Sequence, residues 1–271
     1  MILKDVHLIQ HQLDQHKANH GQFTIEVARL ELVLTETHVK LADLLRSSGI
    51  GINQQGSEDQ YLQALQRVAR LVTLTFIQER PSLLHNLKID QAAAHLGVGS
   101  LYRDQHALEK ASDHLIRAYD LTEALIRIAD SPGLQDKLGV ILMTQGEVLI
   151  KQGQPHTTGQ TSLLETRIAL GKQQRAVKIF RQLEATTIGP LRELTLRRLM
   201  ESLISMTDTL ELLELYDESQ VAMLEAQDIG NRAQRENSTS PLHLHQQICA
   251  CTKATMIARK DLDDHASLFP I

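Results

Sequence analysis

Apolar residues along this chain recur at steps of three and four, and this spacing limits its fold more than any other feature. Ile2, Val6, Ile9 and Leu13 begin the pattern, which puts them on one face of an amphipathic helix. Val and Ile occur inside such patterns and not in the alternating runs typical of strands. The chain has only six Pro and fourteen Gly among 271 residues, so few positions interrupt the helices. The sequence therefore predicts an all-α protein of long helices.

Short breaks rich in Gly, Pro and Ser separate these helices. The most loop-like stretch is Gly49–Gly56, and Ser57 is the expected cap of the helix that follows. Residues 131–133 (Ser-Pro-Gly) and Gly189-Pro190 are further strong breaks. The helices expected between the breaks span residues 2–19, 23–47, 57–79, 81–103, 107–130, 134–152, 160–187, 191–206, 208–234 and 241–260.

The segment from residue 160 to residue 187 has two interpretations. It is either one long helix that contains Gly171, or two short helices broken at Gly171-Lys172. The apolar stripe that includes Leu164 and Ala176 stays in phase across Gly171, and this continuity favours the single helix.

The clearest helix-turn-helix unit runs from His95 to Ala118. Gly99 removes a side chain where the second helix must approach the first, and Ala111 is small enough to permit that approach. Leu115 then fills the space beside them. The spacing of the unit is His95-x2-Val98-Gly99-x2-Tyr102, then eight residues, then Ala111-x3-Leu115-x2-Ala118.

This order resembles the tetratricopeptide repeat, whose signature W-x2-L-G-x2-Y is followed by A-x3-F. His95 stands where the family has Trp, and Gln145-Gly146-x2-Leu149 repeats the first half of the motif in weaker form. Similar places on successive first helices recur about 50 residues apart, at Gly99, Gly146, Met200 and Ala250. A period longer than the roughly 34 residues of the standard repeat resembles the long-hairpin relatives, such as kinesin light chain.

The resemblance implies a right-handed all-α solenoid of about ten antiparallel helices, with a concave face formed by the first helices. We expect one domain over residues 1–271. Residues 1–80 are its N-terminal helical part, residues 81–234 hold the clearest repeat hairpins, and residues 235–271 are a C-terminal capping helix and tail.

Charge and composition exclude several classes of protein. A net charge of −5 argues against a nucleic-acid surface. No apolar run reaches the roughly 18 residues that a membrane span requires, and the N-terminus has no signal-peptide core. Two Cys residues are too few for a disulfide framework and indicate a reducing compartment. The expected location is the cytoplasm, without nucleic-acid or membrane partners.

The chain carries no catalytic constellation. The motifs GxSxG, GxxxxGK[ST] and HExxH are all missing, and Gly97-Val98-Gly99 lies inside a helical pattern and not in a nucleotide-binding loop. We therefore expect no enzyme and no cofactor.

Histidine and cysteine give the sharpest metal candidate, His243-x-His245-x3-Cys249-x-Cys251. His245 and Cys249 share one helix face, but the other two side chains point elsewhere, whereas structural zinc needs four converging ligands. The pairs His7/His11 and His16/His20 have the same spacing and fit a polar helix face. We expect no metal site.

The resemblance implies a non-enzymatic protein–protein interaction scaffold or adaptor, which binds a peptide or helix of a partner on its concave surface. An alternative is a regulatory protein that changes superhelix curvature when it binds a ligand or peptide. A homodimer through the first helix is also compatible with its apolar face. The expected partner-binding residues are Leu96, Ser100, Arg103, Met143, Glu147, Arg197, Arg198 and Glu201.

Overall fold

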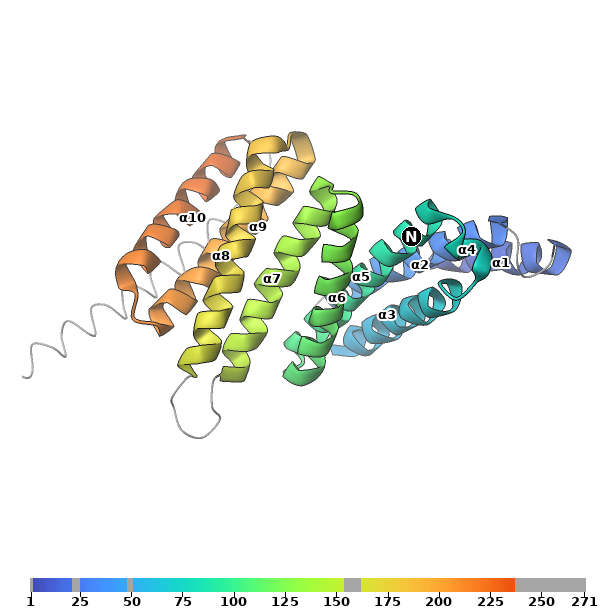
Figure 1. Ribbon diagram of the computed structural model, residues 1–271, viewed down its shortest axis with the longest axis horizontal. Coiled ribbons are helices and arrows are strands. Elements are labelled where there is room, and N and C mark those ends of the chain that lie inside the picture. The colour runs from blue at the N-terminus through green and yellow to red at the C-terminus, as the bar shows by residue number, and fades with distance from the viewer. Residues whose placement is uncertain (1, 21–24, 48–50, 154–161, 237–271) are drawn as a thin grey trace, which may run out of the picture. The chain divides into compact units, whose positions relative to one another are not determined.

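The structure is a computed structural model that describes residues 2–20, 25–47, 51–153 and 162–236 (Figure 1). These residues are helical apart from short turns, and no strand occurs among them, which confirms the all-α prediction. The helices are α1 (Ile2–His20), α2 (Ile25–Ser47), α3 (Gly51–Leu71), α4 (Thr75–Gln78), α5 (Pro81–Asp104), α6 (Leu108–Ile128), α7 (Pro132–Gly153), α8 (Leu163–Thr186), α9 (Gly189–Leu212) and α10 (Tyr216–Glu236).

The chain divides into two compact units, Met1–Ile179 and Phe180–Ile271, with the boundary inside α8. The single domain over residues 1–271 stays a prediction. The continuous α8 confirms the single-helix interpretation of residues 160–187 over its described part, 163–186. A Cβ atom on Gly171 would meet no heavy atom within 4 Å, so the glycine occupies an open position on the helix surface.

The predicted loop Gly49–Gly56 is wrong from residue 51 onward, because α3 begins at Gly51. Ser57 is therefore not a helix cap. Its buried hydroxyl donates a hydrogen bond of 2.9 Å to the carbonyl oxygen of Ala42 on α2. The hydroxyl therefore bonds to a neighbouring helix, and not to the backbone of its own helix as the sequence predicts.

The predicted helix 57–79 is also wrong, because it is interrupted between Leu71 and Thr75. The Thr73 hydroxyl donates to the Arg70 carbonyl oxygen at 2.7 Å, and the Gln78 amide nitrogen donates to the Val72 carbonyl oxygen at 3.2 Å. Side chains thus satisfy carbonyl groups at the end of α3, and a stop there leaves few polar groups unpaired.

The predicted break after residue 206 is wrong as well, since α9 continues to Leu212. The buried Thr207 hydroxyl donates to the Leu203 carbonyl oxygen at 2.9 Å, which accommodates a threonine inside the helix. The turn comes later, at Glu214, whose φ of 60° is left-handed. The predicted helix 241–260 lies outside the described residues.

Gly99 allows α5 and α6 to approach closely, as the sequence predicts. A Cβ atom there would lie 2.7 Å from Leu115 Cγ and 3.3 Å from the Ala111 carbonyl oxygen. Gly146 repeats the contact between α7 and α8, where a Cβ atom would lie 2.9 Å from Gln173 Cγ and 3.3 Å from the Ala169 carbonyl oxygen. The two hairpins therefore share one packing device, a glycine against positions i and i+4 of the next helix.

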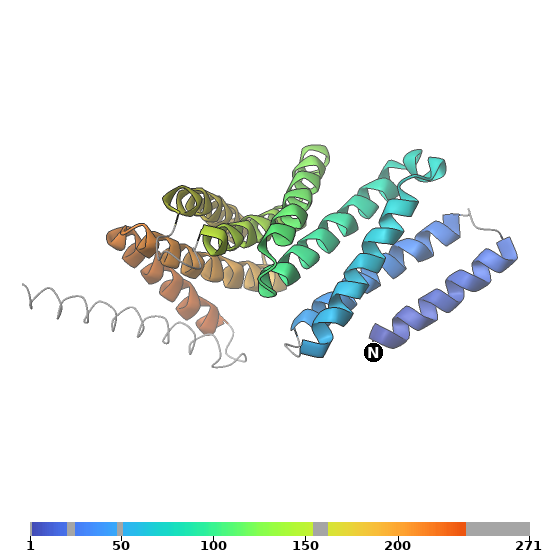
Figure 2. The same ribbon diagram turned by 90° about the horizontal axis from the view of Figure 1, so that it is seen from below.

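In the first unit, each new hairpin packs on both helices of the hairpin before it. Helix α5 contacts α2 and α3, and α7 contacts α5 and α6. Figure 2 shows α2, α3 and α5 lying side by side, in blue, light blue and teal. The first helices α2, α5 and α7 are thus neighbours, so the unit is a stack of helical hairpins. The right-handed superhelix stays a prediction.

In the second unit, α9 packs against α10, and ion pairs join the end of α8 to α10. Arg181 Nη2 lies 2.5 Å from Glu225 Oε2, and Arg232 Nη1 lies 3.0 Å from Glu184 Oε1. No helix in the described parts of the chain is long and apolar enough to cross a membrane.

His95, at the position of the family's Trp, is buried against His114 on α6. Their Nδ1 atoms lie 3.0 Å apart, so one ring donates a hydrogen bond and the other accepts it. Burial lowers the pKa of His95 to about 4, and the charges of His114 and Arg117 act in the same direction. The His95 ring is therefore neutral near pH 7.

Replacing Gly99 with Ala is expected to destabilise the fold by about 1–3 kcal/mol, because the new methyl group overlaps Leu115. The matched control Gly171→Ala is expected to stabilise it by about 0.5–1 kcal/mol, since Ala is the better helix former at an open site. Urea unfolding of the two variants measures both effects. Equal effects of the two substitutions would contradict the close approach at Gly99.

Acid is expected to destabilise the first unit through His95. The unfolded chain binds a proton near pH 6.5, whereas the folded state does so only near pH 4. The contribution of His95 to the free energy of unfolding is therefore fully present above pH 6.5. It is lost as the pH drops toward 4, by on the order of 3 kcal/mol. An NMR titration of the His95 ring checks this directly, and protonation near pH 6.5 in the folded protein would contradict it.

Candidate binding face on the first helices

Four of the predicted partner-binding residues pack between helices or pair with each other. Leu96 packs against a cluster that includes Leu115 and Val148, and Ser100 is buried. Arg103 Nη1 donates to Glu147 Oε2, and this ion pair joins α5 to α7. Arg103 and Glu147 are thus two predicted residues that contact each other directly.

Four further members of the predicted set lie elsewhere. Met143 on α7 is half-buried. Arg197 and Glu201 on α9 are exposed and Arg198 is half-buried; burial lowers the pKa of Arg198, and the charge of Glu201 opposes that change. The α9 residues belong to the second unit and the others to the first. A partner-binding role for all eight residues stays a prediction.

A different group of charged residues gathers on the three neighbouring first helices, and sequence reasoning missed it. Asp90 on α5 and Lys137 on α7 are half-buried. The members on α2 are more exposed, and the complete group is Glu36, Lys40, Asp43, Asp90 and Lys137. Each of these residues interacts electrostatically with at least one member on another helix.

Asp90 has the most altered carboxyl group of the set. Burial raises its pKa to about 7, and the charge of Glu36 adds to the rise. Lys137 and Lys40 oppose it with their positive charges. The pKa of Lys137 is lowered by burial, against the charges of Asp90 and Asp43. Perturbed groups of this kind, on adjoining elements, are typical of functional sites.

Asp90 and Lys137 influence each other without direct contact. Neither forms an ion pair or a side-chain hydrogen bond with another described residue. The α2 members have partners of their own. Glu36 pairs with Lys40 at 2.6 Å, and Asp43 accepts a hydrogen bond from Tyr61 on α3. Asp90 and Lys137 therefore have no direct polar side-chain partner among the described residues.

A repeat signal in the sequence could have found this pair. Asp90 stands nine residues before Gly99, and Lys137 stands nine residues before Gly146. The two residues thus occupy equivalent positions of successive first helices, which stack side by side. Their burial carries no sequence signal, because charged residues at such positions usually face water.

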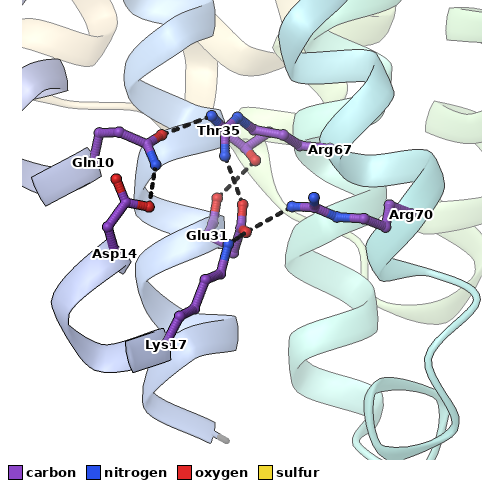
Figure 3. A network of polar contacts seen from close by, with 7 residues as sticks. All are labelled: Gln10, Asp14, Lys17, Glu31, Thr35, Arg67 and Arg70. Atoms are coloured by element: carbon purple, nitrogen blue, oxygen red, sulfur yellow. Dashed lines mark hydrogen bonds and ion pairs between the residues drawn. The ribbon is translucent and has the colours of Figure 1, made fainter. Parts of the chain in front are cut away.

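A second polar cluster ties α1 to α2 and α3 (Figure 3). Glu31 on α2 is 1% exposed. Its Oε1 atom lies 2.6 Å from Lys17 Nζ and 2.6 Å from Arg70 Nη2, and its Oε2 atom lies 2.7 Å from Arg67 Nη1. Burial raises the pKa of Glu31, but hydrogen bonds from Lys17 and Arg67 and the charge of Arg70 outweigh it, so the pKa is lowered.

A metal site at the histidine pairs of α1 stays untested, because the His20 side chain lies outside the described ones. The His11 ring lies 3.0 Å from the amide nitrogen of Gln15, and no three metal-ligating side chains converge within the described ranges. The cluster from His243 to Cys251 lies outside those ranges.

No family model matches the chain, and no curated protein matches it. The chain is similar to three solved structures, each at 15% identity. The de novo designed helical repeat protein DHR64 has a TM-score of 0.37, over 83% of this chain and 99% of that chain. BtubC (BKLC) from P. vanneervenii has a TM-score of 0.39, over 89% and 94%. The DHF58 filament has a TM-score of 0.37, over 83% and 99%.

Replacing Asp90 with Asn is expected to stabilise the protein more at pH 8 than at pH 5. The folded state keeps the Asp90 proton up to about pH 7, whereas the unfolded chain loses it near pH 3.8. Ionisation therefore costs stability as the pH rises through this window, and Asn avoids that cost. Urea midpoints of wild type and Asp90→Asn at both pH values measure the effect.

Asp120→Asn on α6 is the matched control, since Asp120 is exposed. It reports the effect of removing a surface carboxylate. A difference between Asp90→Asn and wild type that is the same at both pH values would contradict the altered pKa.

Proposed function

We propose that the chain is a non-enzymatic interaction scaffold that binds a peptide or a helix of another protein on the face formed by α2, α5 and α7. The observation that carries this proposal is the pair Asp90 and Lys137. A half-buried acid and a half-buried amine lie on neighbouring helices without a direct partner among the described residues. Desolvated charges are costly unless something pairs with them, and a bound partner supplies that pairing.

A peptide main chain has the chemistry that this pair needs. Its N–H group donates to the Asp90 carboxylate, and its carbonyl oxygen accepts from the Lys137 ammonium group. Hydrogen bonds to charged groups are the stronger class.

The proposal includes the finer assignment to long-hairpin relatives of the tetratricopeptide repeat. The recurring contacts of Gly99 with Leu115 and of Gly146 with Gln173 support it, because they occupy the motif positions that the resemblance names. The stacking of α2, α5 and α7 supports a binding face on the first helices. Arg103 and Glu147, paired across α5 and α7, lie on the same two helices and offer further polar groups.

The test begins with peptides selected on the full chain from a random-peptide display library. The dissociation constant of the most enriched peptide is then measured by calorimetry. Asp90→Asn and Lys137→Gln are each expected to weaken binding about tenfold or more, since each removes a hydrogen bond to a charged group. Both variants keep the shape of the side chain or most of its length.

Matched controls carry the same substitutions on the second helices. Asp120→Asn on α6 and Lys178→Gln on α8 change exposed residues and are expected to bind as wild type does. If the two control variants lose binding while Asp90→Asn and Lys137→Gln keep it, the binding site lies on the second helices and the proposal is wrong. Failure to enrich any peptide on the wild-type chain would contradict the scaffold function itself.

A further inference from the structure

The polar cluster around Glu31 holds more positive charge than its single carboxylate compensates. Lys17, Arg67 and Arg70 each pair with Glu31, and none of them makes an ion pair with another described acid. Asp14 enters the cluster only through Gln10, whose amide nitrogen donates to Asp14 Oδ1 at 2.9 Å. Three cations against one paired carboxylate leave two positive charges uncompensated by an ion pair.

The cations are crowded, which makes the excess unfavourable on its own. Lys17 Nζ and Arg70 Nη2 both lie 2.6 Å from the same oxygen, Oε1 of Glu31. The two nitrogens are therefore no more than about 5 Å apart, a distance at which like charges repel strongly in a partly buried site. Joining α1 and α3 to Glu31 on α2 would require one cation from each of the two helices, and the cluster has three.

The cations also keep hydrogen-bond donors that Glu31 does not use. The Arg70 side chain is 58% exposed and the Lys17 side chain 26% exposed, while Glu31 lies behind them at 2%. Lys17 donates one hydrogen bond of the three that an ammonium group can make, and Arg70 donates one of five. Arg67 also donates to Gln10, which fixes its guanidinium beside the other two (Figure 3).

We propose that Lys17 and Arg70, backed by Arg67, form a binding site for a phosphate group. A tetrahedral oxyanion that accepts one hydrogen bond of about 2.8 Å from each cation spans the gap between them. A phosphate near pH 7 carries between one and two negative charges, which matches the two uncompensated positive charges. Guanidinium and ammonium groups are the usual protein partners of phosphate.

Phosphate binding at this site links α1 to α3. Lys17 belongs to α1 and Arg70 to α3, and α1 packs mainly on α2. The site is independent of the α2, α5 and α7 face, because it uses none of the same residues. The phosphate is either the free anion or the monoester of a larger molecule, and the chemistry of recognition is the same for both.

The experiment titrates the full chain with inorganic phosphate and, in parallel, with sodium chloride at matched ionic strength. Phosphate is expected to raise the melting temperature with a saturable concentration dependence, as binding to the folded state requires. Chloride is expected to give only a smaller, unsaturated screening effect. Hydrogen exchange of α1 amides is expected to slow in phosphate.

Arg70→Gln is the deciding variant, because its exposed side chain can be changed with little effect on packing. It is expected to weaken the apparent affinity for phosphate about tenfold or more. Arg127→Gln on α6, whose side chain is 78% exposed, is the matched control and is expected to keep the wild-type response. Lys17→Gln is the second variant on the site and is expected to behave as Arg70→Gln does.

A parallel titration with O-phosphoserine identifies the source of the phosphate. Tighter binding of phosphoserine than of inorganic phosphate assigns the site to a phosphomonoester, and equal binding assigns it to the free anion. The proposal is overturned if neither stabilises the protein beyond matched chloride, or if Arg70→Gln and Lys17→Gln both keep the full phosphate effect.

Discussion

The close approach of paired helices at glycine is the constraint on which the first unit depends. Gly99 and Gly146 place the second helix of each hairpin where a side chain would otherwise stand. On the other side of the hairpins, α5 contacts both α2 and α7, so the three first helices follow one another in the stack. The binding face that we propose exists because the three helices adjoin.

The sequence predicted the helical class and the packing role of Gly99, because helical periodicity and small residues act locally and leave a readable pattern. It failed at Ser57, at the interruption between Leu71 and Thr75, and at the continuation of α9 to Leu212. The Ser57 hydroxyl was expected to cap its own helix, but it donates to the Ala42 carbonyl oxygen on α2, a partner that only the folded chain supplies. A hydrogen bond between two helices, such as this one, has no fixed sequence spacing.

The candidate sites were harder to predict than the fold. Resemblance directed attention to positions next to Gly99, yet Ser100 is buried there and Leu96 packs in a core cluster. The altered groups, Asp90 and Lys137, lie two turns earlier on their helices, and only stacking of the hairpins brings them together. The cluster around Glu31 was missed for the same reason. Its three cations come from α1 and α3, and no sequence pattern predicts that they meet at Glu31.

Amide hydrogen exchange of the full chain, with and without a display-selected peptide, tests the central claim most directly. The account predicts added protection in α2, α5 and α7, strongest around Asp90 and Lys137, where main-chain and side-chain groups of the partner replace water. Protection confined to the second helices α6 and α8, with the first helices unchanged, would contradict it.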